Sequence, residues 1–295
     1  MLIFALEKLS SEIMNHVTLN NGVQMPQMGY GVYQVDPAEC ERCVLDAIGA
    51  GYRLIDTAQA YHNEEGVGEA IRKCGVPRNE LFIVTKVWTS NAGEEKAYAS
   101  ILESLRKLQC DYIDLLLIHQ PFGDYYGTYR AMERAYREGK VRAIGVSNFY
   151  PDRFIDLQAH VEVKPMVNQV ETHVFDQQQE AQQYLQKYGC QIMSWGPFAE
   201  GRNDFFHNEV LTQVGQSHDK TVAQVALRYL LQRGVVIIPK STHKQRMEEN
   251  LDIFDFELST EEMALIAQLD LKRSLFFSHC EPAVVEQFLE WEKIF

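Results

Sequence analysis

The sequence of 295 residues has few cysteines, no long apolar run and no excess of positive charge. Its six cysteines are mostly scattered, which is typical of a reducing compartment, and we expect a cytoplasmic location. No apolar run reaches the roughly 18 residues of a membrane-spanning helix, so we expect no membrane partner. The net charge of −13 would repel a phosphate backbone, so we also expect no nucleic-acid partner.

The remaining composition, 46% hydrophobic and 23% charged, is globular. The apolar start of the chain is short and has no basic segment in front of it, which argues against a signal peptide. We expect residues 1–15 to be a disordered extension, with Met14 as an alternative start, and residues 16–295 to be a single domain. We expect that domain to be a monomer.

Cys40 and Cys43 form the one closely spaced cysteine pair, in a segment with helical apolar spacing. A redox or metal site is one interpretation of this pair. The favoured interpretation is that Cys40 and Cys43 are two structural thiols one helical turn apart, because no second Cys or His pair has ligand spacing. His62 and His173 also have no ligand-spaced partner, so we expect no bound metal.

Short apolar segments recur along the chain and alternate with segments of helical pattern. Several are apolar at consecutive positions, which is typical of strands buried on both faces in a parallel sheet. We predict strands at 28–32, 53–56, 82–86, 113–118, 143–146, 166–170, 192–195 and 235–238.

Eight helical segments lie between and after these strands. Asp36 and Pro37 are suited to begin the first helix, and a glycine follows several of the helices. We predict helices at 37–50, 63–74, 94–108, 128–138, 151–160, 177–188, 221–232 and 243–251. This alternation predicts an α/β fold, the (β/α)8 TIM barrel. We also expect an N-terminal hairpin at 16–24 that turns at Asn21-Gly22, and extra C-terminal helices, one of them at 261–269.

In such a barrel, catalytic residues lie at the carboxyl ends of the strands. Asp56, Lys86 and His119 stand at the ends of three consecutive predicted strands, and Tyr61 follows the first of them. A buried lysine needs a partner, and pairing Lys86 with Asp56 would satisfy both charges. We therefore predict that these four residues form one site.

This predicted proximity has a consequence for the phenol of Tyr61. An ammonium group beside it would favour the phenolate and lower its pKa from about 10. Tyr61 would then be a usable proton donor near neutral pH, and His119 would hold a substrate carbonyl oxygen.

The segments around these residues resemble the aldo-keto reductase family. The resemblance extends from the hairpin to about residue 270, and the compact tail is similar to the small bacterial branch with 2,5-diketogluconate and methylglyoxal reductases. It is carried by 53–71, 84–88, 114–119, 144–149 and 238–241, continuing through Arg246 to 249–250.

The resemblance implies a barrel that reduces a small carbonyl substrate with NADPH. Tyr61 would be the general acid, and Lys86, paired with Asp56, would lower its pKa. His119 would orient and polarise the carbonyl. The residues expected to line the substrate pocket beside His119 are Tyr33, Trp88 and Gln120.

The resemblance also implies a cofactor site along the rim. Ser147, Asn148 and Gln169 would bond the nicotinamide carboxamide, and Trp195 would stack on its ring, where many relatives have tyrosine. Lys240 and Arg246 would bind the 2′-phosphate, which favours NADPH over NADH. The other expected cofactor contacts are Asp56, Gly196, Pro197, Phe198, Ser241 and Thr242, with Glu249 and Asn250 on the adenine.

Only a short loop, 120–124, follows the fourth predicted strand. We therefore expect an open pocket with loose selectivity for aldehydes, ketoaldehydes or keto-sugars. Two other functions stay open: a regulatory subunit that binds NADPH without strong catalysis, and a metal-dependent hydrolase of the same fold. The hydrolase is disfavoured because no His or Asp ligands cluster in the sequence.

Overall fold

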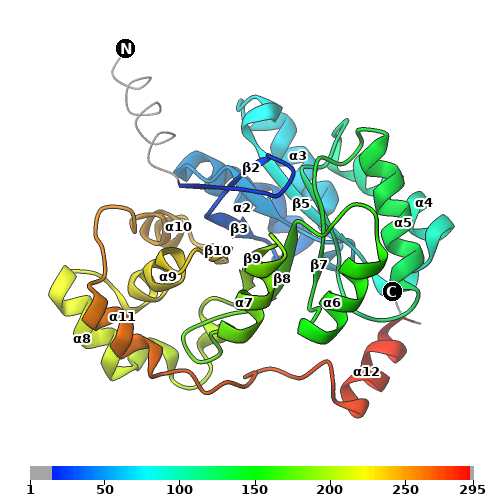
Figure 1. Ribbon diagram of the computed structural model, residues 1–295. Helices are drawn as coiled ribbons and strands as arrows, with labels where there is room; N and C mark the ends of the chain where they lie inside the picture. Colours follow the sequence, from blue (N-terminus) through cyan, green and yellow to red (C-terminus); the bar gives the residue numbers. More distant parts are fainter. Residues whose placement is uncertain (1–14, 293–295) are drawn as a thin grey trace.

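The computed structural model describes residues 15–292, and its centre is a barrel of eight parallel strands in chain order (Figure 1). The first and last strands meet where Met28 bridges to Ile237, and the Gly31 amide donates to the Pro239 carbonyl. The predicted (β/α)8 barrel is confirmed. Its strands are β3 (Gly29–Gly31), β4 (Leu54–Asp56), β5 (Phe82–Val87), β6 (Leu115–Ile118), β7 (Ile144–Ser147), β8 (Val167–Glu171), β9 (Gln191–Trp195) and β10 (Val236–Ile237).

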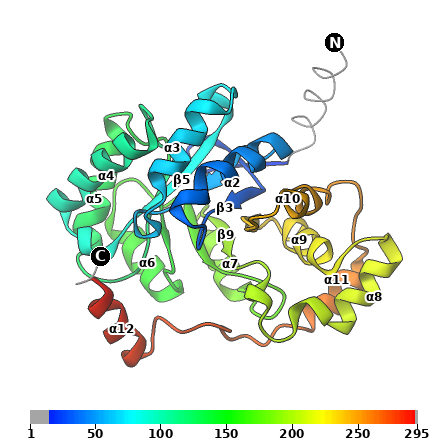
Figure 2. The same ribbon diagram turned by 180° about the vertical axis from the view of Figure 1, so that it is seen from behind.

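Helices surround the barrel and follow each strand, as both views show (Figures 1 and 2). Every residue of β5, β6, β7 and β8 is buried, because one side chain faces the barrel interior and the next faces these helices. The helices that follow the strands are α2 (Pro37–Ala50), α3 (Glu64–Lys73), α4 (Glu94–Leu108), α5 (Tyr125–Arg137), α6 (Pro151–His160), α7 (Gln179–Lys187), α9 (Val222–Gln232) and α10 (Lys244–Leu251).

The ends of α2 show how local sequence sets a boundary. Asp36 accepts the backbone N–H of Ala38, and Pro37 has the backbone angle that a first helical position requires. At the other end Gly51 has φ 120°, and its N–H donates to the carbonyls of Ala47 and Ile48. The predicted bounds of this helix are confirmed at both ends.

The predicted hairpin is present as β1 (His16–Thr18) paired with β2 (Gln24–Pro26). Its loop is longer than the predicted two-residue turn. The Gly22 N–H donates to Leu19 O, and Gly22 has φ 87°, a conformation that glycine adopts without strain. Asn20 and Asn21 bond the carbonyls of residues just before β8 and β7, so the hairpin lies at the amino ends of the strands.

The helix α8 (Glu209–His218), between β9 and α9, was not predicted. A second C-terminal helix, α12 (Pro282–Glu292), accords with the expected extra C-terminal helices, although its bounds were not predicted. The predicted C-terminal helix is present as α11 (Thr260–Ala267). Two predicted helix starts differ by more than one residue, because α7 begins at Gln179 rather than 177 and α5 begins at Tyr125 rather than 128. There Asp124 accepts the N–H of Gly127 and caps the helix three residues earlier.

The segment that joins α11 to α12 runs across one end of the barrel (Figure 1). The expected extension, including Met14, lies outside the described residues except for Asn15. Across residues 15–292, we find no helix with the length and apolar character that a bilayer crossing requires.

Candidate active site

The four predicted catalytic residues lie together at the carboxyl ends of neighbouring strands. Asp56 ends β4, Lys86 lies in β5 and His119 directly follows β6. Tyr61 ends a short 3₁₀ helix after β4, η1 (Gln59–Tyr61). Parallel register places these strand ends side by side, so the barrel brings residues up to 63 positions apart into one cluster.

Lys86 is the centre of this cluster and is fully buried. Its Nζ atom donates to Asp56 Oδ1 at 2.6 Å, to the Thr57 carbonyl at 2.9 Å and to the Tyr61 hydroxyl at 3.3 Å. All three donor positions of the ammonium group are therefore used. The shortest contact, to Asp56, pairs the two charges as the sequence predicted.

The expected shift of the Tyr61 pKa has the wrong sign. Burial raises the pKa of Tyr61 well above 10, and the carboxylate of Asp56 and the phenol of Tyr33 add to that rise. The physical reason is that burial removes water from around the phenol, which penalises the charged phenolate more than the neutral phenol. Tyr61 is therefore a neutral phenol with a proton to donate.

His119 lies beside Tyr61, with ring centroids 5.5 Å apart. Burial lowers the pKa of His119 well below 6.5, and the charge of Lys86 lowers it further. The imidazole is therefore neutral at physiological pH. A neutral ring next to the phenol can contact a carbonyl oxygen without adding a second charge to the site.

The expected substrate-lining residues surround this pair. Tyr33 is 52% exposed and its ring centroid lies 5.0 Å from that of Tyr61. The Trp88 ring lies 5.0 Å from His119. Gln120 is buried, and its Oε1 atom accepts N–H groups from Asn148 and from His279, a residue that sequence reasoning did not place here.

The C-terminal segment contributes more of this wall than the sequence predicted. His279 stacks on Phe288 of α12, and Phe288 contacts the ring of Trp88. Phe277 also packs on Phe288. Aromatic side chains from the tail therefore cover part of the rim, whereas the short loop after β6 alone would leave the pocket open.

The residues expected at the nicotinamide are also neighbours. Gln169 donates to Asp56 Oδ2 at 2.8 Å, and Ser147 donates to the Gln169 carbonyl at the same distance. The Trp195 indole N–H donates to Asn148 Oδ1 at 2.8 Å. The side chains of Ser147, Asn148, Gln169 and Trp195 thus form a continuous polar edge beside the catalytic cluster. They lie on or directly after β7, β8 and β9.

The residues expected at the phosphate and adenine line a separate cavity of about 490 Å³. It lies between the loop after β9 and the start of α10. Gly196 and Pro197 precede the lining residues on the β9 loop. The expected residues that line the cavity are Phe198, Lys240, Ser241, Thr242, Arg246, Glu249 and Asn250, and sequence reasoning missed Phe206, Thr221 and Val222.

This cavity has the chemistry that a phosphate requires. Lys240 and Arg246 are exposed, and neither has a carboxylate partner among residues 15–292. In a chain of net charge −13, two cations without partners in one cavity are suited to an anion. The Ser241 hydroxyl adds a donor. The residues present therefore fit a nucleotide with a phosphate at this end.

The cysteine pair has a structural setting. Cys40 and Cys43 are buried, free thiols on α2, and burial raises the pKa of Cys40 to about 12. A protonated thiol is a poor nucleophile and a poor metal ligand. Among residues 15–292, no group of three or more metal-binding side chains is present.

Comparison with known proteins identifies one family. The sequence model of the aldo/keto reductase family matches residues 22–271. Glyoxal reductase of Bacillus subtilis (strain 168) is 49% identical over 264 residues, which cover 89% of this chain and 95% of that protein.

Solved structures give the same similarity. An aldo-keto reductase from a Medee basin deep-sea metagenome library has a TM-score of 0.88 at 40% identity, covering 90% of this chain and 98% of that one. Bombyx mori aldo-keto reductase, solved in complex with NADP, has a TM-score of 0.84 at 35% identity, covering 88% and 94%.

Proposed function

The chain belongs to the aldo/keto reductase family and is an oxidoreductase acting on carbonyl groups, and from that premise we propose that it uses NADPH and that Tyr61 supplies the proton. The observation that carries the proposal is the triple contact of Lys86 with Asp56, Thr57 and Tyr61. It places a protonated phenol against a fixed ammonium group at the carboxyl end of the barrel.

Tyr61 acts as general acid in this proposal. Its O–H donates to the substrate carbonyl oxygen and then transfers the proton to it. The phenolate left behind lies 3.3 Å from the Lys86 ammonium, which stabilises the negative charge as it forms. Because burial raises the pKa of Tyr61, the phenol keeps its proton until negative charge develops on the carbonyl oxygen of the substrate.

His119 and Asp56 act on either side of this step. The neutral imidazole contacts the same carbonyl oxygen and orients it toward Tyr61. Asp56 holds Lys86 and, through its second oxygen, the amide of Gln169. One carboxylate therefore links the catalytic cluster to the edge where the cofactor is expected.

The cofactor would supply the two electrons as hydride from its dihydronicotinamide, so that the carbonyl, NADPH and one proton give an alcohol and NADP⁺. Ser147, Asn148 and Gln169 would hold the carboxamide, and the Trp195 ring would limit the tilt of the nicotinamide. The bound NADP of the Bombyx mori relative supports a nicotinamide cofactor.

The phosphate end favours NADPH over NADH. The Lys240 and Arg246 cations lie in one cavity with Ser241, which suits a 2′-phosphate, and Glu249 and Asn250 lie farther along the same wall. NADH has a hydroxyl in that place and would leave both cations without a partner.

The substrate class that we propose is small aldehydes, ketoaldehydes and keto-sugars. The glyoxal reductase at 49% identity supports a small dicarbonyl. The pocket wall of Tyr33, Trp88 and the tail aromatics suits an uncharged carbonyl compound.

A panel of carbonyls tests this proposal in the wild-type chain. Each compound is mixed with NADPH or NADH, and oxidation is followed at 340 nm. We expect turnover of several small aldehydes, with kcat/KM for NADPH at least roughly tenfold above that for NADH. Strong preference for NADH, or no turnover with any compound, would contradict the proposal.

A further inference from the structure

We infer that Glu171 is a positioning residue for the aromatic ring of Trp195, an inference that rests on the proposed function. Glu171 ends β8 and pairs in register with Trp195 at the end of β9. Its side chain is only 6% exposed. A buried carboxylate is costly unless hydrogen bonds hold it, and the proposed chemistry does not use this one.

His173, which follows the end of β8, orients the carboxylate of Glu171. The Nδ1 atom of His173 accepts the backbone N–H groups of Phe175 at 3.2 Å and Asp176 at 3.0 Å. Nδ1 is therefore the acceptor nitrogen and Nε2 carries the proton. Nε2 donates to Glu171 Oε1 at 2.9 Å, which fixes the direction of the carboxylate.

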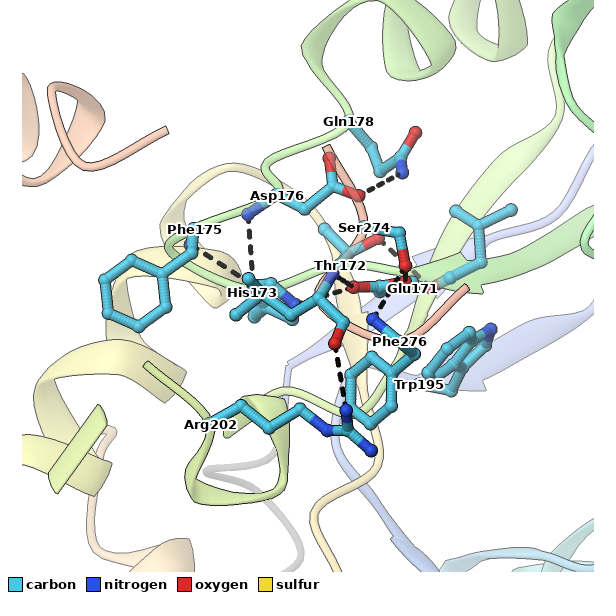
Figure 3. Close-up of polar contacts among 12 residues, drawn as sticks. Glu171, Thr172, His173, Phe175, Asp176, Gln178, Trp195, Arg202, Ser274 and Phe276 are labelled. Atoms are coloured by element: carbon cyan, nitrogen blue, oxygen red, sulfur yellow. Dashed lines mark hydrogen bonds and ion pairs between the residues drawn. The ribbon is translucent and has the colours of Figure 1, made fainter. Parts of the chain in front are cut away.

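The C-terminal segment supplies the other hydrogen bonds to this carboxylate (Figure 3). The Ser274 hydroxyl donates to Glu171 Oε2 at 2.5 Å, and the Leu275 N–H donates to Oε1 at 2.9 Å. The Ser274 oxygen also accepts the N–H groups of Phe276 and Phe277 at 2.9 Å. One hydroxyl thus joins a buried charge to the backbone of the tail.

Arg202 holds the same segment from the loop after β9. Its guanidinium donates to the Leu275 carbonyl at 3.1 Å and lies 4.3 Å from the centre of the Phe276 ring (Figure 3). The hydrogen bond holds the backbone just before Phe276, and the cation–π contact holds its ring. Phe276 is therefore held at its backbone and at its ring.

Phe276 in turn rests against Trp195. The two rings meet edge to face with centroids 5.2 Å apart, and the Trp195 N–H donates to Asn148 Oδ1. The ring of Trp195 is thus fixed by Asn148 at its nitrogen and by Phe276 at its surface. The carboxylate of Glu171 acts on this ring through Ser274, Leu275 and the phenylalanine side chains that follow them.

The consequence concerns the geometry of the transfer step rather than affinity. Reacting atoms need to be held about 3 to 3.5 Å apart, and a shift of about 1 Å can cost 10²-fold in rate. The charged contacts expected to bind the nucleotide lie in the other cavity, at Lys240 and Arg246. A loosened Trp195 should therefore slow transfer more than it weakens binding.

Substitution of Ser274 tests the inference without altering the barrel. Ser274→Ala removes the hydroxyl that bonds Glu171, and Ser274→Thr keeps a hydroxyl as the conservative rescue. Arg273→Gln is the matched control, because Arg273 is the exposed neighbour in the same segment. Thermal unfolding of all variants shows whether the fold is unchanged.

Two readouts are needed, and one requires no cofactor. Hydrogen–deuterium exchange of the segment 275–277 in the chain alone should be about tenfold faster in Ser274→Ala and near wild type in the other two variants. The single-turnover rate of NADPH oxidation by an aldehyde should fall about tenfold in Ser274→Ala. The Kd for NADPH should change less than about threefold.

Unchanged exchange in Ser274→Ala would overturn the inference, because the hydroxyl bond to Glu171 would not hold the tail. Faster exchange with an unaltered transfer rate would also overturn it, because Trp195 would not depend on the tail. Absence of turnover in the wild type is a different result. It would contradict the proposed function itself, and the inference would fall with it.

Discussion

At the scale of single residues, the proposed chemistry depends on how the buried charges of Lys86 and Asp56 lie around Tyr61. The Lys86 ammonium lies 2.6 Å from Asp56 Oδ1 and 3.3 Å from the Tyr61 hydroxyl, and burial raises the pKa of Tyr61 despite this nearby positive charge. The sequence predicted that these residues meet, because each follows or ends a neighbouring strand. It could not predict the sign of the Tyr61 pKa shift, because desolvation depends on packing around the phenol.

The two cations of the phosphate cavity carry a separate prediction. Arg246→Met and Lys240→Met remove a charge but keep an apolar stem. Each should raise the Kd for NADPH by about 10- to 100-fold, since a hydrogen bond to a charged group contributes about 1.5 to 3 kcal/mol. The Kd for NADH should change little, because it has no 2′-phosphate.

Fluorescence titration with both nucleotides measures this effect. Lys244→Met is a suitable control, because Lys244 is exposed on the same helix and pairs with Glu248. Equal weakening of NADPH and NADH binding would show that the cavity does not bind the 2′-phosphate.

At the scale of elements, the eight strands were predictable because consecutive apolar residues are required where both faces are buried. The helix α8 was not, because its pattern is interrupted by Gly215. A Cβ at that position would lie 2.4 Å from the Lys220 carbonyl oxygen, so close packing explains the glycine. The contact of His279 with Gln120 joins positions 159 residues apart, and no local pattern encodes it.

The amino end of β6 carries a stability prediction. Asp114 is fully buried and bonds Arg78 at 2.7 Å, Arg142 at 2.6 Å and the Ile83 N–H at 2.9 Å. Asp114→Asn would remove the negative charge with which the guanidinium groups of Arg78 and Arg142 both pair. We expect a loss of roughly 3 kcal/mol in the free energy of unfolding, because removing the buried carboxylate leaves the paired arginines without a counter-charge.

Urea denaturation measures that loss, with Asp111→Asn as an exposed control just before β6. The proposed active site lies at the opposite end of the barrel, so kcat of the folded variant should be unchanged. A loss below about 1 kcal/mol would mean that the two arginines find equivalent partners.

At the scale of the whole molecule, stability should depend on pH through an acidic cluster beside the tail. Burial raises the pKa of Asp176 to about 6, and Glu171 and Asp270 add to the rise. The folded state therefore holds this proton more tightly than the unfolded chain does. The contribution of Asp176 to stability is greatest below its unfolded pKa of 3.8 and is lost as pH rises through about 6.

Asp176→Asn should consequently stabilise the protein at high pH. We expect a gain of about 1 to 2 kcal/mol at pH 8, allowing for solvent screening of a partly hydrated carboxylate. The gain should be smaller at pH 5, where much of the wild-type carboxyl group is protonated. Chemical denaturation at both pH values measures it, and a gain that did not grow with pH would show that Asp176 is not destabilised by its charge.

The Asp114 network and the proposed catalytic cluster lie at opposite ends of the barrel, which separates effects on stability from effects on turnover. The hairpin and the Asp114 network lie at the amino ends of the strands. The proposed catalytic cluster, the two proposed cofactor regions and the tail lie at or near the carboxyl ends. Asp114→Asn at the amino ends should therefore alter stability without altering turnover, whereas Tyr61→Phe at the carboxyl ends should alter turnover.

Replacement of Tyr61 by phenylalanine tests the central claim most directly. The variant keeps the ring and loses only the proton donor, so turnover of a small aldehyde should fall by about 10² to 10⁴ while the Kd for NADPH stays within about twofold. Tyr184→Phe, at an exposed tyrosine of α7, should match the wild type. A Tyr61→Phe variant that kept wild-type turnover would contradict the assignment of this phenol as the acid.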